Sequence, residues 1–233
     1  MGEGYKVMEV KIEYRGDNDN EVRFVVSGSD VNVRFVNSLR RAMIAEVPKL
    51  AIDEVKIYEN NSLLYDEQLA LRLGLIPLKV RNIHDYSEED KVTLTLKAES
   101  PERAGYTKVY SKELISSDPG VEPAFGNIPI VKLVSKEREI SGIRTVAQQR
   151  VSFEAIARLG RGKEHAKWQP VTICTFKELS QPNEQQKSFL FTVESDGALP
   201  VDDIVVEAAR ILRDKFEWLV NELRLKAQAQ VQS

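Results

Sequence analysis

Cysteine and histidine are scarce in this sequence of 233 residues. Cys174 is the only cysteine, and His84 and His165 are the only histidines. A single cysteine cannot form a disulfide within the chain, which excludes the disulfide-rich secreted domains. A structural zinc site usually takes four Cys or His ligands and an iron–sulfur cluster usually takes four cysteines, so we expect no cofactor. A carboxylate site for magnesium or calcium is left open, although no EF-hand spacing occurs.

The sequence also lacks long apolar runs and an excess of positive charge. No stretch approaches the ~20 apolar residues that span a membrane, and the first residues lack the apolar core of a signal peptide. Lys and Arg number 33 against 36 Asp and Glu, so the formal net charge is −3. Proteins that bind nucleic acid autonomously are usually basic. We therefore expect a soluble, cytoplasmic protein with no membrane partner, in which only a local basic patch could contact nucleic acid.

What the sequence does contain is enough apolar residues for a folded core, in patterns that change along the chain. Apolar and polar residues alternate in 5–14 and 21–27, on either side of a turn-forming segment at 16–20. This pattern predicts a β-hairpin with one face buried. Residues 31–46 then repeat apolar side chains at steps of four, which predicts an amphipathic helix that ends before Pro48.

The remainder reads as mostly β-structure followed by one long helix. We predict a short helix at 62–74 and a long one at 202–227, and strands at 50–58, 91–97, 107–114, 130–134, 151–158, 171–177 and 189–194. The last helix would be nearly 40 Å long at ~1.5 Å per residue. The order of elements predicts an α+β fold in which both chain ends form one domain and a β-rich domain is inserted into it.

No complete catalytic motif stands out. The segment 160–163 lacks the first glycine and the Ser or Thr of a phosphate-binding loop. Two acidic pairs, at 53–54 and 66–67, could serve acid–base chemistry, but such pairs are commonly solvated or cap helices. No serine or cysteine nucleophile is indicated near His165, and Cys174 lies in a predicted strand. A stand-alone enzyme is therefore a remote alternative.

The two amphipathic helices carry more information than these motifs. A helix near 40 Å long exceeds what a small sheet can cover, and an uncovered apolar stripe is unusual on a monomer. The pattern alone favours a dimerising module, with an ordinary core as the alternative. The apolar positions that we expect at the interface are Phe35, Leu39, Met43, Val205, Ala208, Leu212, Phe216 and Leu219.

The first helix has a recognisable sequence, VNSLRRAMIAEVP at 36–48. It resembles the signature helix of the alpha-type subunits of cellular RNA polymerases, and most of all the archaeal D-type subunits. The resemblance continues through AIDEV, NNS, DEQLALRLGLIPL, HAKWQPV and FTVESDG, which occupy 51–55, 60–62, 66–78, 165–171 and 191–197. These motifs extend from about residue 31 into the last helix.

The resemblance implies a non-catalytic assembly subunit of DNA-directed RNA polymerase. In this family a dimerisation domain pairs with a smaller alpha-like subunit, called L in archaea. The pair then binds the two large catalytic subunits and the small zinc-binding subunits N and P, and DNA is reached only through the complex. We expect Asn37, Arg40 and Arg41 to contact a large subunit, and His165, Lys167 and Trp168 to contact a small or a large subunit. A homodimeric alpha-like scaffold is the alternative.

The sequence departs from the family pattern in one important respect. Many D-type subunits carry a ferredoxin-like domain with iron–sulfur cysteines before the FTVESDG segment, whereas here only 178–187 bridges that gap. We therefore predict a member without that domain and without a cluster. The expected dimerisation domain is 1–47 with 188–233, and the inserted domain is 48–187. The polar segment 135–150 has no role that the resemblance explains.

Overall fold

The computed structural model describes residues 8–16, 19–140, 143–180 and 186–231. The chain divides into two compact units, which are described separately. Unit 1 combines 1–47 with 161–233, and unit 2 is 48–160. The α+β class predicted from the sequence is confirmed, since antiparallel sheets occur together with a long C-terminal helix. Within the described part of the chain, no helix has the length and apolar character needed to cross a membrane.

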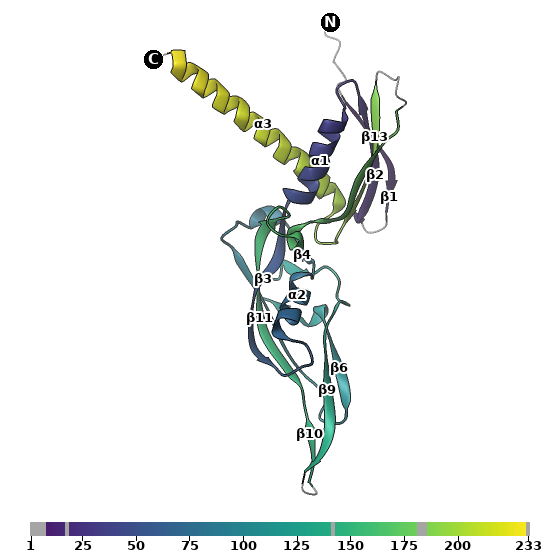
Figure 1. Cartoon of the computed structure of the whole chain (residues 1–233), viewed down its shortest axis with the longest axis vertical. Helices are drawn as coiled ribbons and strands as arrows, with labels where there is room; N and C mark the ends of the chain where they lie inside the picture. Colours follow the sequence, from purple (N-terminus) through teal and green to yellow (C-terminus); the bar gives the residue numbers. More distant parts are fainter. Residues whose placement is uncertain (1–7, 17–18, 141–142, 181–185, 232–233) are drawn as a thin grey trace. The chain divides into compact units, whose positions relative to one another are not determined.

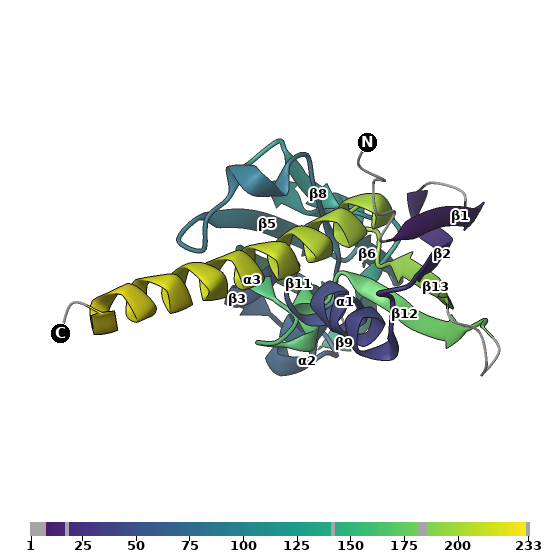
Figure 2. The same ribbon diagram turned by 90° about the horizontal axis from the view of Figure 1, so that it is seen from above.

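Unit 1 consists of a four-stranded antiparallel sheet and two helices (Figures 1 and 2). The sheet has the order β1-β2-β13-β12, with bounds Glu9–Arg15, Glu21–Gly28, Lys187–Ser195 and Val171–Glu178. The helices are α1, Val33–Ala45, and α3, Val201–Val231. α1 contacts β12, α3 contacts β2 and β13, and the helices contact each other. The predicted hairpin and both predicted long helices are therefore present.

Local sequence explains where these helices begin and end. Asn32 caps α1, since its side-chain Oδ1 accepts a hydrogen bond from the backbone N–H of Phe35 at 3.0 Å. α1 ends at Ala45, three residues before Pro48. Asp202 and Asp203 lie in the first turn of α3, where the helix dipole favours negative charge. With 31 residues, α3 is about 46 Å long.

Unit 2 is built mainly from strands around one closed apolar core. Its largest sheet has the order β3-β11-β5-β7, with bounds Pro48–Asn60, Arg150–Arg161, Lys91–Glu99 and Ile115–Ser116. A second sheet, β10-β9-β6, comprises Ile143–Ala147, Pro129–Ile140 and Gly105–Tyr110. β4, Leu78–Val80, pairs with β8, Val121–Pro123. The helix α2, Asp66–Gly74, packs on β3 and β9 through the fully buried Leu69 and Leu73.

A predicted domain boundary and a predicted helix start differ from the structure, as do the ends of several strands. We predicted that the inserted domain extends to residue 187, but unit 2 ends at residue 160. The reason is that β12 pairs with β13 along its whole length and thus belongs to the sheet of unit 1. The short helix predicted at 62–74 begins only at Asp66, because the polar side chains of Asn60 and Ser62 hold the preceding residues in a hydrogen-bonded turn.

Candidate dimerisation surface

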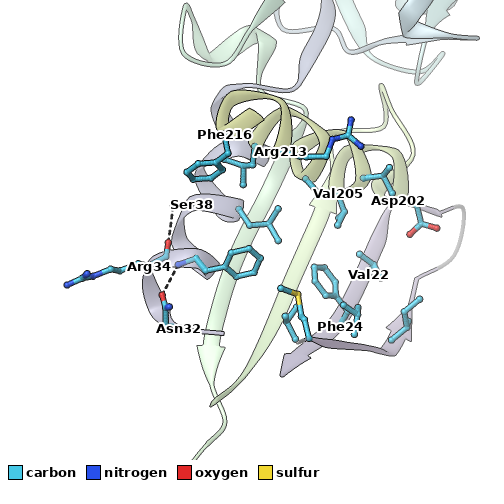
Figure 3. A pocket seen from close by; sticks show the side chains of 18 of the residues that line it. Val22, Phe24, Asn32, Arg34, Ser38, Asp202, Val205, Arg213 and Phe216 are labelled. Carbon is cyan, nitrogen blue, oxygen red and sulfur yellow. Dashed lines mark hydrogen bonds between the residues drawn. The ribbon is translucent and has the colours of Figure 1, made fainter. Parts of the chain in front are cut away.

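An open groove of about 900 Å³ lies on unit 1, between the sheet and the two helices (Figure 3). Its floor is formed by β1 and β2, and its walls by α1 and α3. Most of its lining is apolar: Met8, Val10, Ile12, Val22, Phe24, Val26, Phe35, Leu39, Val205, Val206, Ala209, Leu212 and Phe216. The elements therefore bring apolar residues from both chain ends to one surface that the described residues of unit 1 do not fill.

The floor of the groove shows how far the hairpin is left uncovered. Antiparallel pairing sets Val10 opposite Val26 and Ile12 opposite Phe24, so all four share one face. On β2 these partners are buried, but Val10 is 60% and Ile12 50% exposed. Our prediction that one face of the whole hairpin is buried is therefore wrong for β1. Every residue of this edge strand is exposed, because α1 and α3 do not extend over it.

The two helices contribute most of the residues that the sequence had assigned to an interface. Phe35 and Leu39 of α1 line the groove, as do Val205, Leu212 and Phe216 of α3. Phe216 is 62% exposed. The sequence reasoning missed the contribution of β1 and β2, although their alternation of apolar residues was the available signal.

Two of the proposed interface residues are not at this surface. Met43 and Ala208 have no exposed area, because they lie on the sides of α1 and α3 that pack within unit 1. They belong to the same repeats as the groove residues Phe35 and Leu212, but a few tens of degrees of rotation around the helix separate a groove residue from a core residue. They are therefore core residues of this chain.

The second half of α3 continues the apolar surface beyond the groove. Leu219 is half exposed and lies past the last groove residue, Phe216. Figure 1 shows this end of α3 extending away from the sheet of its unit. The large apolar side chains exposed here are Phe216, Trp218, Leu219, Val220, Leu223 and Leu225. Such a density of exposed apolar side chains on one helix is unusual for a surface that stays in water.

Charged residues lie at the rim of the groove. Arg15 of β1 forms an ion pair with Asp202 of α3 at 2.7 Å, which links the hairpin to the start of the helix. Arg213 lines the groove and donates to the neighbouring Asp214 at 2.8 Å. An apolar centre with a polar rim is the usual anatomy of a protein interface.

Glu46 fixes α3 against the end of α1. Its carboxylate lies 2.8 Å from Nζ of Lys215 on α3 and 3.4 Å from Nζ of Lys163 in the following loop. The hydrogen bond from Lys215 is the main reason why the pKa of Glu46 is lowered, and Lys163 adds to the effect while partial burial opposes it. Three separate segments of unit 1 thus meet at one carboxylate.

The three polar residues of α1 that were assigned to a large subunit differ in their environment. Arg40 donates two hydrogen bonds, both of 3.1 Å, to Oδ1 of Asn37. These two side chains are half-buried, whereas Arg41 is exposed. Arg41 is thus the most accessible of the three, and Asn37 holds the Arg40 guanidinium in a fixed orientation.

The loop from Gly162 to Gln169 packs on the end of α1. The backbone N–H of Lys163 donates to the carbonyl of Ala45 at 3.0 Å. A Cβ atom at Gly162 would collide with the carbonyl oxygen of Ile44, so only glycine permits this approach.

Trp168 is part of the core and not a surface contact residue, contrary to our prediction. Only 2% of its area is exposed, because the turn Ala166–Trp168 directs the indole inward. Lys167 Nζ lies 4.4 Å from the centre of its ring. His165 caps the turn, since its Nδ1 accepts from the N–H of Lys167 at 3.1 Å. His165 is exposed and Lys167 half-buried, so these two can still reach a partner.

The residues considered for catalysis have structural partners. Asp53 pairs with Arg158 at 2.6 Å, and Asp66 accepts from Asn60 at 2.7 Å. Burial raises the pKa of the Cys174 thiol to about 11, which keeps it protonated and unreactive near neutral pH. Among the residues that the structure describes, no group of three or more His, Cys, Asp or Glu side chains could hold a metal ion.

An open apolar face of this size on an α+β unit is typical of a polypeptide that functions as a subunit. A family model of the RNA polymerase Rpb3/Rpb11 dimerisation domain matches residues 23–216. That range begins in β2, includes α1 and ends at Phe216, the last groove residue of α3. The chain therefore belongs to the Rpb3/Rpb11 dimerisation family of RNA polymerase subunits.

Curated relatives narrow this to the Rpo3 type. The DNA-directed RNA polymerase subunit Rpo3 of Thermococcus kodakarensis is 38% identical, over 93% of this chain and 98% of the relative. Rpo3 of Pyrococcus horikoshii is 35% identical, over 92% and 98%. Rpo3 of Methanobrevibacter smithii is 41% identical, over 72% of this chain and 58% of the relative. Within its family the chain is thus a subunit of DNA-directed RNA polymerase of the archaeal Rpo3 type.

Proposed function

We propose that the groove is the site at which a second, L-type alpha-like subunit completes unit 1, so that the chain acts as half of a heterodimer. The observation that carries this proposal is the uncovered floor of the groove. Val10 and Ile12 lie at least half exposed, beside apolar residues of α1 and α3. Burial of this apolar surface against the partner supplies the driving force, at about 25 cal/mol per Å² buried.

A different chain as partner is favoured over a second copy. The matching family description pairs two names, Rpb3 and Rpb11, in one dimerisation domain. A homodimeric alpha-like scaffold is the alternative, and it would use the same groove. The two differ only in the mass of the complex.

The heterodimer then serves as a non-catalytic platform for the two large catalytic subunits and for the small zinc-binding subunits N and P. Arg41, Arg40 and Asn37 on α1 support this role, since guanidinium groups suit bidentate contacts with carboxylates or carbonyl oxygens of a partner. His165 and Lys167 are candidates for a further contact. The ion pair of Asp53, the hydrogen bond that the exposed Asp66 accepts from Asn60, and the burial of Cys174 give no support to a catalytic role.

We also propose that this subunit works in the cytoplasm and without an iron–sulfur cluster. One cysteine is too few for the usual four ligands. The alignment with the Thermococcus relative spans 274 positions, more than the 233 residues of this chain, so that relative has segments which this chain lacks.

Co-expression with an L-type subunit, followed by mass measurement of the purified complex, tests the pairing. We expect a one-to-one heterodimer, which Leu212→Asp and Phe216→Asp abolish because a carboxylate in the groove would lose its hydration. Leu71→Asp is the matched control, since Leu71 on α2 is also 62% exposed but lies outside the groove. A heterodimer that forms equally well with all three variants would rule the proposal out.

A further inference from the structure

The sheet β10-β9-β6 of unit 2 separates its charges onto two faces. Strand pairing sets Lys108 opposite Lys132, Lys136 opposite Ala147, and Arg138 opposite Thr145. Alternation along β9 puts Lys132, Lys136 and Arg138 on one face, and cross-strand pairing adds Lys108 to it. All four basic side chains are exposed. Among the described residues of these three strands, no acidic side chain shares that face.

The acidic residues of the same strand lie on the opposite face. Glu137 and Glu139 alternate with the basic residues, and Glu139 pairs across the ribbon with Arg144. Part of the polar segment 135–150, which had no assigned role, therefore forms a two-stranded ribbon. One of its faces carries Lys136 and Arg138 beside Thr145 and Ala147, with no acidic side chain among the described residues, and its other face is mixed.

Aromatic side chains interleave with the basic ones. Tyr106 lies on the basic face of β6 and is 57% exposed, and Nζ of Lys132 lies 4.2 Å from the centre of its ring. Two residues further along β6, beyond Lys108, Tyr110 lines a pocket of about 580 Å³ together with Lys112 and Phe125. An exposed ring thus lies among the ammonium groups of the basic face, and a second tyrosine follows further along the same strand.

The position of the ribbon is fixed by buried hydrogen bonds at its base. Ser135 donates to Oγ of Ser100 at 2.6 Å, and that oxygen also accepts from the backbone N–H of Gln149 at 2.8 Å. Oε1 of Gln149 accepts from the N–H of Val134 at 2.8 Å. The basic face is therefore presented by an ordered part of unit 2, which lowers the entropy cost of binding. Figure 1 shows β9 running from its pairing with β6 into the β9–β10 ribbon.

We propose that this basic face, centred on Tyr106, Lys132 and Lys136, binds single-stranded nucleic acid. Three of the four basic residues on this face are lysines. Lysine binds phosphate and is depleted in protein–protein interfaces, whereas arginine is enriched there. Exposed rings beside cations suit the stacking of unpaired bases next to their phosphates. A duplex would keep its bases out of reach of a flat sheet face, which is why the proposal commits to a single strand. This inference goes beyond the pairing of unit 1 and uses no residue of the groove.

Fluorescence anisotropy with labelled oligo(U) and oligo(dT) strands of about 20 nucleotides tests this, using the full chain in its heterodimer. We expect the logarithm of the binding constant to fall linearly with the logarithm of the salt concentration between about 50 and 200 mM. Lys132→Glu/Lys136→Glu should lower the affinity at least tenfold and reduce the salt slope by about 1.4, at ~0.7 per lost phosphate contact. Comparing oligo(U) with oligo(dT) shows whether the face prefers RNA or DNA, and binding of either one supports the site.

Two further variants separate specific contact from net charge. Lys56→Glu/Lys97→Glu changes the charge equally at exposed positions on β3 and β5 and should leave binding within twofold. Tyr106→Ala should weaken binding about tenfold through lost stacking, while Tyr106→Phe retains it. The proposal would be overturned if neither oligo(U) nor oligo(dT) binds, or if the control pair loses as much affinity as Lys132→Glu/Lys136→Glu. So would preferential binding of an acidic polypeptide such as poly-glutamate, which would identify the face as a protein contact.

Discussion

The two units of this chain bury their apolar residues to different degrees. Unit 2 has a closed core to which its two larger sheets, β3-β11-β5-β7 and β10-β9-β6, and α2 contribute. Leu94, Leu133 and Phe153 in this core are at most 1% exposed. Unit 1 buries β2 and part of α1 under its own elements but leaves apolar groove residues of β1 and α3, such as Val10, Ile12 and Phe216, at least half exposed. The difference shows that unit 2 completes its own core, whereas unit 1 has apolar surface that its described residues leave open.

The sharpest way to test this comparison is to remove a core side chain of unit 2. Phe153 on β11 lies opposite Leu96 of β5 and is almost fully buried. We expect Phe153→Ala to destabilise unit 2 by about 3–5 kcal/mol, because the cavity it leaves cannot collapse. That is a large fraction of a typical stability of ~5–15 kcal/mol. Hydrogen exchange of unit 2 peptides in the heterodimer measures the loss, and normal protection in the variant would contradict a closed core.

A groove residue should show the opposite behaviour. Ile12 is half exposed in the chain alone, so Ile12→Ala should change its stability by less than about 0.5 kcal/mol. In the heterodimer the same change should weaken pairing about tenfold, or ~1.4 kcal/mol, because the side-chain carbon atoms that the partner would bury are lost. Titration of the L-type subunit measures the affinity. Lys11→Ala, on the other face of β1, is the control and should leave the affinity unchanged; similar losses in both would mean that β1 is not part of the interface.

How much of this could be predicted from the sequence depends on which contacts decide each residue's position. Periodicity was sufficient for α1, α3 and the β1–β2 hairpin, because each depends on local pattern. It could not distinguish Met43, which is buried, from Phe35, which lines the groove, since both belong to one four-residue repeat. It also could not show that Trp168 is in the core, because the direction of a loop side chain depends on long-range packing.

The same limit applies to domain boundaries and to the groove floor. β12 belongs to unit 1 because of its pairing with β13, and no local signal in 171–178 reveals that partner. The alternation in β1 correctly indicated an apolar face, but not whether this chain or another one covers it. Sequence pattern identifies apolar faces, whereas only the fold shows which of them remain open.

The smallest expected effect concerns Glu46, which joins α3 to α1 and to the loop at Lys163. Its pKa is lowered in the folded chain, mainly by the hydrogen bond from Lys215. The ion pairs therefore stabilise unit 1 fully above the unfolded-state pKa of about 4.3, and this contribution is lost as the pH falls through the lower, folded value. Both lysines are about half exposed, so each pair is worth roughly 0.2–1 kcal/mol.

Comparing Glu46→Gln with the unaltered chain across pH isolates that contribution. At neutral pH the variant should unfold at slightly lower urea concentration, and the difference should shrink as the pH falls through the lowered pKa of Glu46 in the folded chain, where the native carboxylate takes up a proton. Glu59→Gln, at an exposed position of β3 in unit 2, serves as the control because its side chain takes no part in the α1–α3 contact. A difference that is independent of pH would show that the side chain matters for its packing and not for its charge. Because the groove walls are α1 and α3, a looser α3 should also reduce the affinity for the L-type subunit at neutral pH, by less than the tenfold expected for Ile12→Ala.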